Sequence, residues 1–147
     1  MVGPKKRFAL ADTAQQVVGG FLLAGPFVVT EEVWVLASHM ELFQGVLTVL
    51  IVFLIGYGAL YKADDDRDPD RESEVAGVPS RFISLMVVSF GSVAILALVF
   101  DAPETFLAET TYVGGEPTME TVAITLRAIS VGAIFSVVGA ATADSVF

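Results

Sequence analysis

Four long apolar runs alternate with shorter polar segments along the chain. Each run is close to the roughly 20 residues that an α-helix needs to cross the hydrocarbon core of a bilayer. The pattern predicts transmembrane helices at residues 14–37, 43–61, 81–100 and 121–143. The expected fold is therefore all-α, with residues 1–147 forming a single membrane domain, a bundle of four transmembrane helices.

Composition supports this interpretation. Hydrophobic residues make up 54% of the chain, the mean hydropathy is +0.73, and charged residues make up 17%. A soluble domain is about 25% charged. The charges are also concentrated in a few short stretches rather than spread along every helix. We therefore expect a multi-pass protein of the cell membrane whose main partner is the lipid bilayer.

Basic residues predict the orientation in the membrane. Seven of the eight fall in two clusters, which comprise Lys5, Lys6 and Arg7, and Lys62, Arg67, Arg71 and Arg81. Cytoplasmic segments carry an excess of Lys and Arg. Both termini and the acidic loop 62–80 are therefore expected in the cytoplasm, and loop 101–120 outside. The first run is long and contains Pro26 and two glutamates, which favours a retained helix over a cleaved signal peptide.

The net charge of −9 and pI near 4.3 exclude the basic surface typical of nucleic-acid binding. Surplus carboxylates are typical of halophile proteins. The alternative is that the acidic loop has a specific function of its own. Asp64, Asp66 and Asp68 have the spacing of a calcium loop, but the required glycine and the bidentate glutamate are missing. Solvation is thus favoured over a metal site at these aspartates.

Catalytic chemistry has little support in this sequence. The chain has no cysteine, and its one histidine, His39, directly follows an apolar run, as an interfacial polar residue would. Motifs for phosphate binding, for zinc proteases or for a nucleophile elbow are missing. We expect no enzyme activity, no catalytic residues and no cofactor.

Two adjacent carboxylates, Glu31 and Glu32, interrupt the first apolar run, and Arg127 interrupts the fourth. Glu31 lies about six residues before the outer end of its predicted helix, and Arg127 about six residues after the outer start of its own. At about 1.5 Å rise per residue, both lie roughly 9 Å below the outer surface. Each charge alone would cost up to about 2.5–3.5 kcal/mol. We therefore predict a polar centre in which Arg127 pairs with Glu31 or Glu32.

Gln16 and Glu31 share one face of the predicted first helix. Pro26 has no amide hydrogen, so it leaves the backbone carbonyl of Leu22 free on the N-terminal side of the two glutamates. Three interpretations stay open for the centre: a static lock between helices, a pathway for protons or cations, and a contact between protomers. The first predicted function is accordingly an oligomeric ion or proton channel or transporter. The alternative is a non-transporting scaffold or accessory subunit.

The last apolar run contains a strip of small residues that includes Gly132, Ser136 and Gly139. Such strips let helices approach closely in lipid. The strip fits packing inside the bundle or a seam of a homo-oligomer. Trp34 is interpreted as an interfacial anchor, and Asp144 as part of a solvated C-terminus.

The stretch "GPFVVTEEVW" resembles a family of integral membrane proteins with a domain of unknown function. Its first-helix motif is Pro-x3-Thr-x-Glu-x-Trp, which Pro26, Thr30, Glu32 and Trp34 match here. The resemblance implies a membrane protein and supplies no catalytic role. It also implies that Glu32, rather than Glu31, belongs to the motif.

Overall fold

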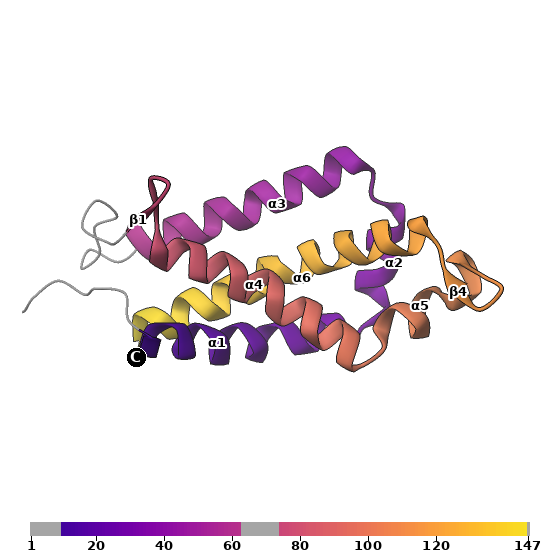
Figure 1. Cartoon of the computed structure of the whole chain (residues 1–147), viewed down its shortest axis with the longest axis horizontal. Coiled ribbons are helices and arrows are strands. Elements are labelled where there is room, and N and C mark those ends of the chain that lie inside the picture. Colours follow the sequence, from indigo (N-terminus) through magenta and orange to yellow (C-terminus); the bar gives the residue numbers. More distant parts are fainter. Residues whose placement is uncertain (1–9, 63–73, 147) are drawn as a thin grey trace, which may run out of the picture.

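The computed structural model describes residues 10–62 and 74–146. Helices dominate this part of the chain (Figure 1). They are α1 (Leu10–Val28), α2 (Glu31–His39), α3 (Leu42–Tyr57), the short π-helical segment η1 (Gly58–Lys62), α4 (Ser80–Val99), α5 (Ala102–Thr111) and α6 (Met119–Val146). The calcium-like aspartates of the acidic loop lie outside the described residues.

Three helices in the described residues are long and apolar enough to cross a membrane: α3 together with η1, α4, and α6. A fourth span arises only if α1 and α2 are counted together, and these two helices are bent by 79° where the chain breaks. The prediction of one continuous helix over 14–37 is therefore wrong. The other three predicted helices agree with the observed bounds to within a few residues.

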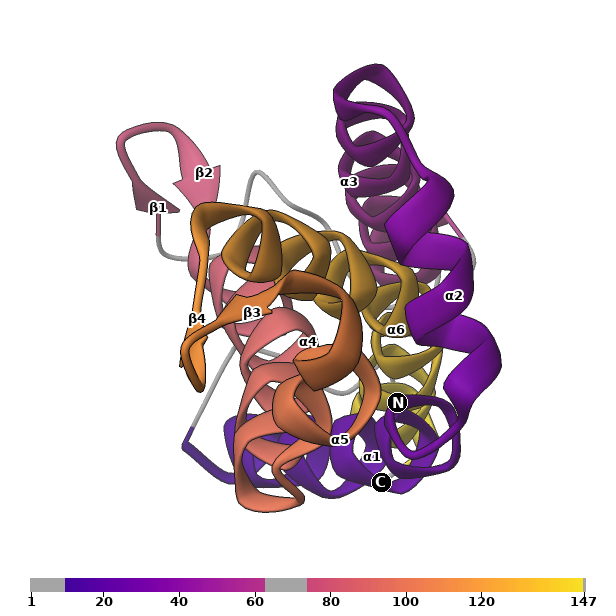
Figure 2. The ribbon, with the colours of Figure 1, turned by 90° about the vertical axis from the view of Figure 1, so that its right-hand side faces the viewer.

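The antiparallel course of the long helices gives the bundle two distinct ends (Figure 1). We call one the Arg81 end, where α1 and α4 begin and α6 ends, and the other the α5 end, where α1 and α4 end and α6 begins. Helices α1, α4 and α6 pack on one another, whereas α3 lies mainly along α6. Viewed from the α5 end, α2 crosses the side of the bundle and α3 stands apart from α1 (Figure 2).

Two small antiparallel hairpins make the fold mostly helical rather than purely α. They pair β1 (Glu74–Val75) with β2 (Val78–Pro79), and β3 (Tyr112–Val113) with β4 (Glu116–Pro117). Both two-residue turns have positive φ at each central position, at Ala76 and Gly77 and at Gly114 and Gly115. This backbone matches the twist of a tight hairpin and favours glycine. The predicted outer loop 101–120 therefore contains a helix and a hairpin.

Helices α1 and α6 approach so closely that their backbones touch. A Cβ atom on Gly19 would lie 2.7 Å from Ala143 Cβ and would also meet the Gly139 carbonyl. One turn further along, Ser136 Oγ donates a hydrogen bond to the Gly20 carbonyl at 3.1 Å. Gly132 packs against Val93 of α4. The small-residue strip of α6 therefore lies inside the bundle.

Apolar side chains fill the interior on both sides of this contact. Towards the α5 end, one cluster includes Ala24, Val93 and Ala128, from α1, α4 and α6 respectively. Towards the Arg81 end, a second cluster joins α3 and η1 to α4 and α6 through residues such as Val52 and Leu85. The long helices are thus held along most of their length by apolar packing.

We predict that Gly19→Ala destabilises the protein, because the new methyl group would overlap the α6 backbone. Overpacking of this kind costs about 1–3 kcal/mol. Gly91→Ala is the matched control, since a Cβ there meets no atom within 4 Å, and it should be neutral or stabilising by roughly 0.5–1 kcal/mol. Thermal unfolding in detergent compares the two variants. Equal melting temperatures would contradict the close α1–α6 contact.

Candidate functional site

A buried polar cluster lies at the Arg81 end, where three helices meet. Its six residues, which we call the Arg81 cluster, are Asp12, Thr13 and Gln16 from α1, Arg81 and Ser84 from α4, and Asp144 from α6. The side chains of Arg81 and Asp144 have 0% exposure, whereas that of Asp12 keeps 21%. A charged pair without any solvent contact is rare in a protein interior and requires close partners.

The Arg81 guanidinium binds carboxylates from two different helices. Its Nη1 donates to Oδ1 and Oδ2 of Asp144 at 2.7 and 3.0 Å, and its Nη2 donates to Asp12 Oδ2 at 3.1 Å. A planar guanidinium carries five donors in a rigid fork, which suits it to bind two carboxylates at once. Arg81 therefore ties the start of α4 to the start of α1 and to the end of α6.

Gln16 connects the same helices a second time through its amide. Its Nε2 donates to Asp144 Oδ2 at 3.0 Å, and its Oε1 accepts a hydrogen bond from Ser84 Oγ at 2.7 Å. The Thr13 hydroxyl lies 3.3 Å from Ser84 Oγ. Each polar group of Gln16 thus has a partner on another helix, which satisfies a side chain that is completely buried.

The helix dipoles do not explain where the two central charges lie. Arg81 is in the first turn of α4 and Asp144 in the last turn of α6. Cations are favoured at helix C-termini and anions at N-termini, so each side chain sits at the unfavourable end of its own helix. The direct ion pair must outweigh both effects. Asp12, in contrast, lies in the first turn of α1, where the dipole favours a carboxylate.

The predicted polar centre of Glu31, Glu32 and Arg127 is not the cluster that the structure forms. Gln16 lies in the Arg81 cluster, at the opposite end of the bundle from Arg127, and within the described residues the structure does not bring Arg127 and the two glutamates together as an ion pair. Glu31 and Glu32 are exposed in the first turn of α2. Glu31 and Arg127 would lie at equal depth only if Glu31 continued the axis of α1, and the chain instead bends by 79° before it. The predicted pairing of Arg127 with a glutamate is therefore wrong, and the ion pairs found inside the bundle join Arg81 to Asp12 and Asp144.

The break itself is built by residues of the predicted motif. Pro26 lies in the last turn of α1 and has no amide hydrogen to continue the helical ladder. After the break, Thr30 Oγ1 donates to the Phe27 carbonyl at 2.9 Å. Glu32 follows in the first turn of α2, where the helix dipole stabilises a carboxylate. The glutamates thus mark the start of a new helix.

Trp34 does not anchor the protein at a lipid interface, as the sequence had indicated, because its side chain is buried with 1% exposure. Its Nε1 donates to the Val28 carbonyl at 3.0 Å, and its ring stacks on Phe106 of α5 at 5.9 Å between centroids. In a continuous helix the amide four residues ahead would donate to the Val28 carbonyl. Because the chain turns after Val28, that amide does not reach it. Trp34 therefore closes the break and joins α2 to α5.

Carboxylates and hydroxyls surround a cleft of about 250 Å³ at the α5 end, lined by Glu31, Ser38, Thr110 and Glu120 among others. Nearby, partial burial and then the carboxylates of Glu104, Asp101 and Glu116 raise the pKa of the Tyr112 phenol in β3. Among the described residues no group of three or more His, Asp or Glu side chains could hold a metal ion.

Sequence reasoning missed Arg81, Asp144, Asp12 and Ser84 as site residues. Arg81 belongs in the sequence to the basic cytoplasmic cluster, and the expectation of a solvated Asp144 is wrong, because this residue is buried. One signal was present. Antiparallel helices bring the start of the first and third spans to the same level as the end of the fourth. Asp12, Arg81 and Asp144 therefore share one depth in the membrane.

Comparison with protein families agrees with the membrane architecture. The sequence matches the family described as "Putative integral membrane protein (DUF2391)" over residues 4–144. The chain therefore belongs to this integral membrane protein family of unknown function. No curated protein and no solved structure matches the chain.

A double-mutant cycle between Arg81 and Asp144 should show strong coupling. Arg81→Met or Asp144→Asn alone leaves a buried partner without its counterpart and should cost about 3–5 kcal/mol. The double variant should cost clearly less than the sum of the two single variants. Unfolding in detergent provides the free energies.

Glu31→Gln is the control for this cycle. Its side chain is exposed, so the substitution should stay within about 0.5 kcal/mol of the wild type. Additive costs for Arg81→Met and Asp144→Asn would show that the two residues do not act as a pair.

Proposed function

We propose that the protein is a non-enzymatic scaffold or accessory subunit of the cell membrane, in which the Arg81 cluster locks α1, α4 and α6 together. The observation that carries this proposal is the completely buried Arg81–Asp144 ion pair, reinforced by Asp12 and Gln16. A charge pair of this kind fixes the relative register of the helices that supply it.

The surroundings of the Arg81 cluster also support a fixed lock. Between the cluster and the α5 end, Gly19 touches the α6 backbone and Gly132 packs on Val93. Beyond this contact, buried Val28, Val93 and Ala128 continue the apolar interior. Ser89 and Ser92 of α4 donate to carbonyls of their own helix at 2.6 Å. These hydroxyls are therefore engaged locally rather than aligned along a path.

Transport by a channel or transporter is the second candidate. One observation favours it: the chain of hydrogen-bonding groups from Thr13 through Ser84 and Gln16 to the Asp144 carboxylate. Connected hydroxyl, amide and carboxyl groups inside a membrane are typical of proton relays. In this alternative, Arg81 would hold the Asp144 carboxylate while a proton moves to or from it.

The proposed orientation places both termini and the 62–80 segment in the cytoplasm, which puts the Arg81 end inside and the α5 end outside. The asymmetry of Lys and Arg supports it, because the 101–120 segment contains neither residue. The surplus of acidic residues supports a halophile environment. The expected homo-oligomer stays a prediction.

Proteoliposome flux measurements separate the two candidate functions. The scaffold proposal predicts that wild-type protein and Asp144→Asn give the same proton and potassium leak as protein-free vesicles under an imposed membrane potential. Proton flux through the wild type that Asp144→Asn abolishes, and that Glu32→Gln leaves intact, would contradict the scaffold and establish transport.

Cysteine labelling tests the orientation, because the native chain has no cysteine. Lys6→Cys should react with an impermeant maleimide only after the cells are opened. Thr110→Cys, on the exposed side of α5, should react in intact cells. Labelling of both positions from the same side would overturn the proposed topology.

A further inference from the structure

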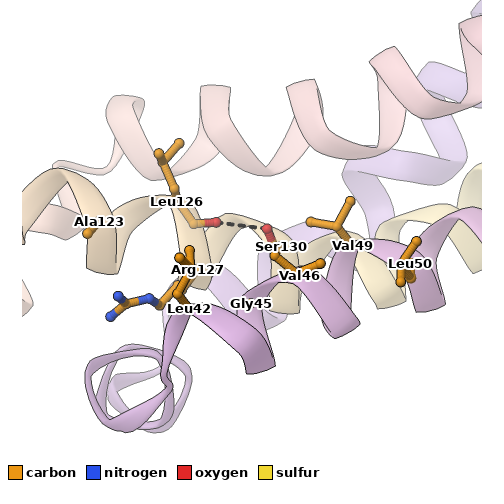
Figure 3. A pocket seen from close by; sticks show the side chains of 9 residues that line it. All are labelled: Leu42, Gly45, Val46, Val49, Leu50, Ala123, Leu126, Arg127 and Ser130. Carbon is orange, nitrogen blue, oxygen red and sulfur yellow. Dashed lines mark hydrogen bonds between the residues drawn. The ribbon is translucent and has the colours of Figure 1, made fainter.

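A groove of about 360 Å³ runs between α3 and α6 near the α5 end (Figure 3). Its walls are mainly aliphatic. They include Leu42, Val46 and Leu50 from α3, and Ala123 and Leu126 from α6. The Ser130 hydroxyl at its edge donates to the Leu126 carbonyl at 2.9 Å and so is already engaged. The groove therefore offers an apolar surface to an occupant.

The guanidinium of Arg127 stands at one end of this groove. The Arg127 stem lies over Gly45, since a Cβ added to Gly45 would be 3.6 Å from Arg127 Cγ. Figure 3 shows the head group turned away from the aliphatic walls. Within the described residues no carboxylate forms an ion pair with Arg127. Two turns into an apolar helix, such a cation requires a counter-charge.

We propose that the α3–α6 groove binds an anionic phospholipid, with its phosphate on Arg127 and an acyl chain along the aliphatic walls. Only an amphiphile supplies both a negative charge at one end and an apolar chain along the rest of the groove. A guanidinium forms paired, charge-assisted hydrogen bonds to phosphate. The lipid belongs to the leaflet at the α5 end, where the long arginine side chain can extend towards the headgroups.

Gly45 lies on the groove wall beside the Arg127 stem. It lines the groove between Leu42 and Val46, and a Cβ at this position would already be in ordinary contact with the Arg127 stem, at 3.6 Å from Cγ. A larger residue at position 45 would occupy the space of the acyl chain without removing the charge. Charge and groove shape can therefore be tested separately.

Lipid binding is measured on the full-length protein by native mass spectrometry, with phosphatidylglycerol and phosphatidylcholine added in equal amounts. The wild type should retain phosphatidylglycerol preferentially. Arg127→Gln should weaken its retention by about tenfold or more, because a charge-assisted contact is lost. Arg127→Lys should restore most of it. Gly45→Leu should also weaken binding, and Gly91→Leu, on an open face of α4, should not.

Several results would overturn the proposal. Equal retention of both lipids, or no effect of Arg127→Gln, would exclude recognition of charge. Normal binding to Gly45→Leu would exclude the groove, and full competition by soluble glycerol phosphate would show an anion site without an acyl chain. A dimer that forms in delipidated wild type and is lost in Arg127→Gln would assign the groove to a second copy. Circular dichroism checks that each variant folds, and if Gly45→Leu does not, the two Arg127 variants decide the outcome.

Discussion

The guanidinium of Arg81 has no exposed surface, yet it carries a full charge into a bundle that is apolar over most of its length. Desolvation of such a charge is costly unless opposite charges and hydrogen bonds compensate for it. Asp144 and Asp12 supply those charges from two other helices. The ends of α1, α4 and α6 must therefore meet at one level, and this requirement sets the register of the whole three-helix core.

The close backbone contact of α1 with α6 follows from the same register. With the helix ends fixed by Arg81, Gly19 and Gly139 come to lie opposite each other, and the small residues on both sides allow the approach. Beyond this contact α1 ends after Pro26 and the chain turns by 79° into α2. Thr30 and Trp34 satisfy the Phe27 and Val28 carbonyls at that turn.

Much of the fold could be predicted from the sequence because a bilayer imposes a length on each apolar run. Helices α3, α4 and α6 were recognisable for that reason. The break in the first run was not, since the apolar run continues beyond Pro26 to Val35, and a proline inside a helix can produce either a kink or a break. Among the site residues, Gln16 was expected to be a polar residue of the helix interior, but as part of a different cluster. Arg81 and Asp144 were not, because charges near helix ends are usually solvated, and only tertiary packing decides which of them are buried.

The contact between Arg81 and Asp144 can be observed directly in the membrane-embedded protein. Solid-state NMR on protein labelled with ¹⁵N in arginine side chains and ¹³C in aspartate carboxyl groups measures the short nitrogen–carbon distances. With oxygen–nitrogen separations of 2.7 and 3.0 Å, we expect strong dipolar dephasing of an aspartate carboxyl signal that disappears in Asp144→Asn. A second dephased signal, from Asp12 at 3.1 Å, should remain in that variant. A spectrum in which Asp144→Asn removes no dephased carboxyl signal would show that the helices are not held together by this ion pair.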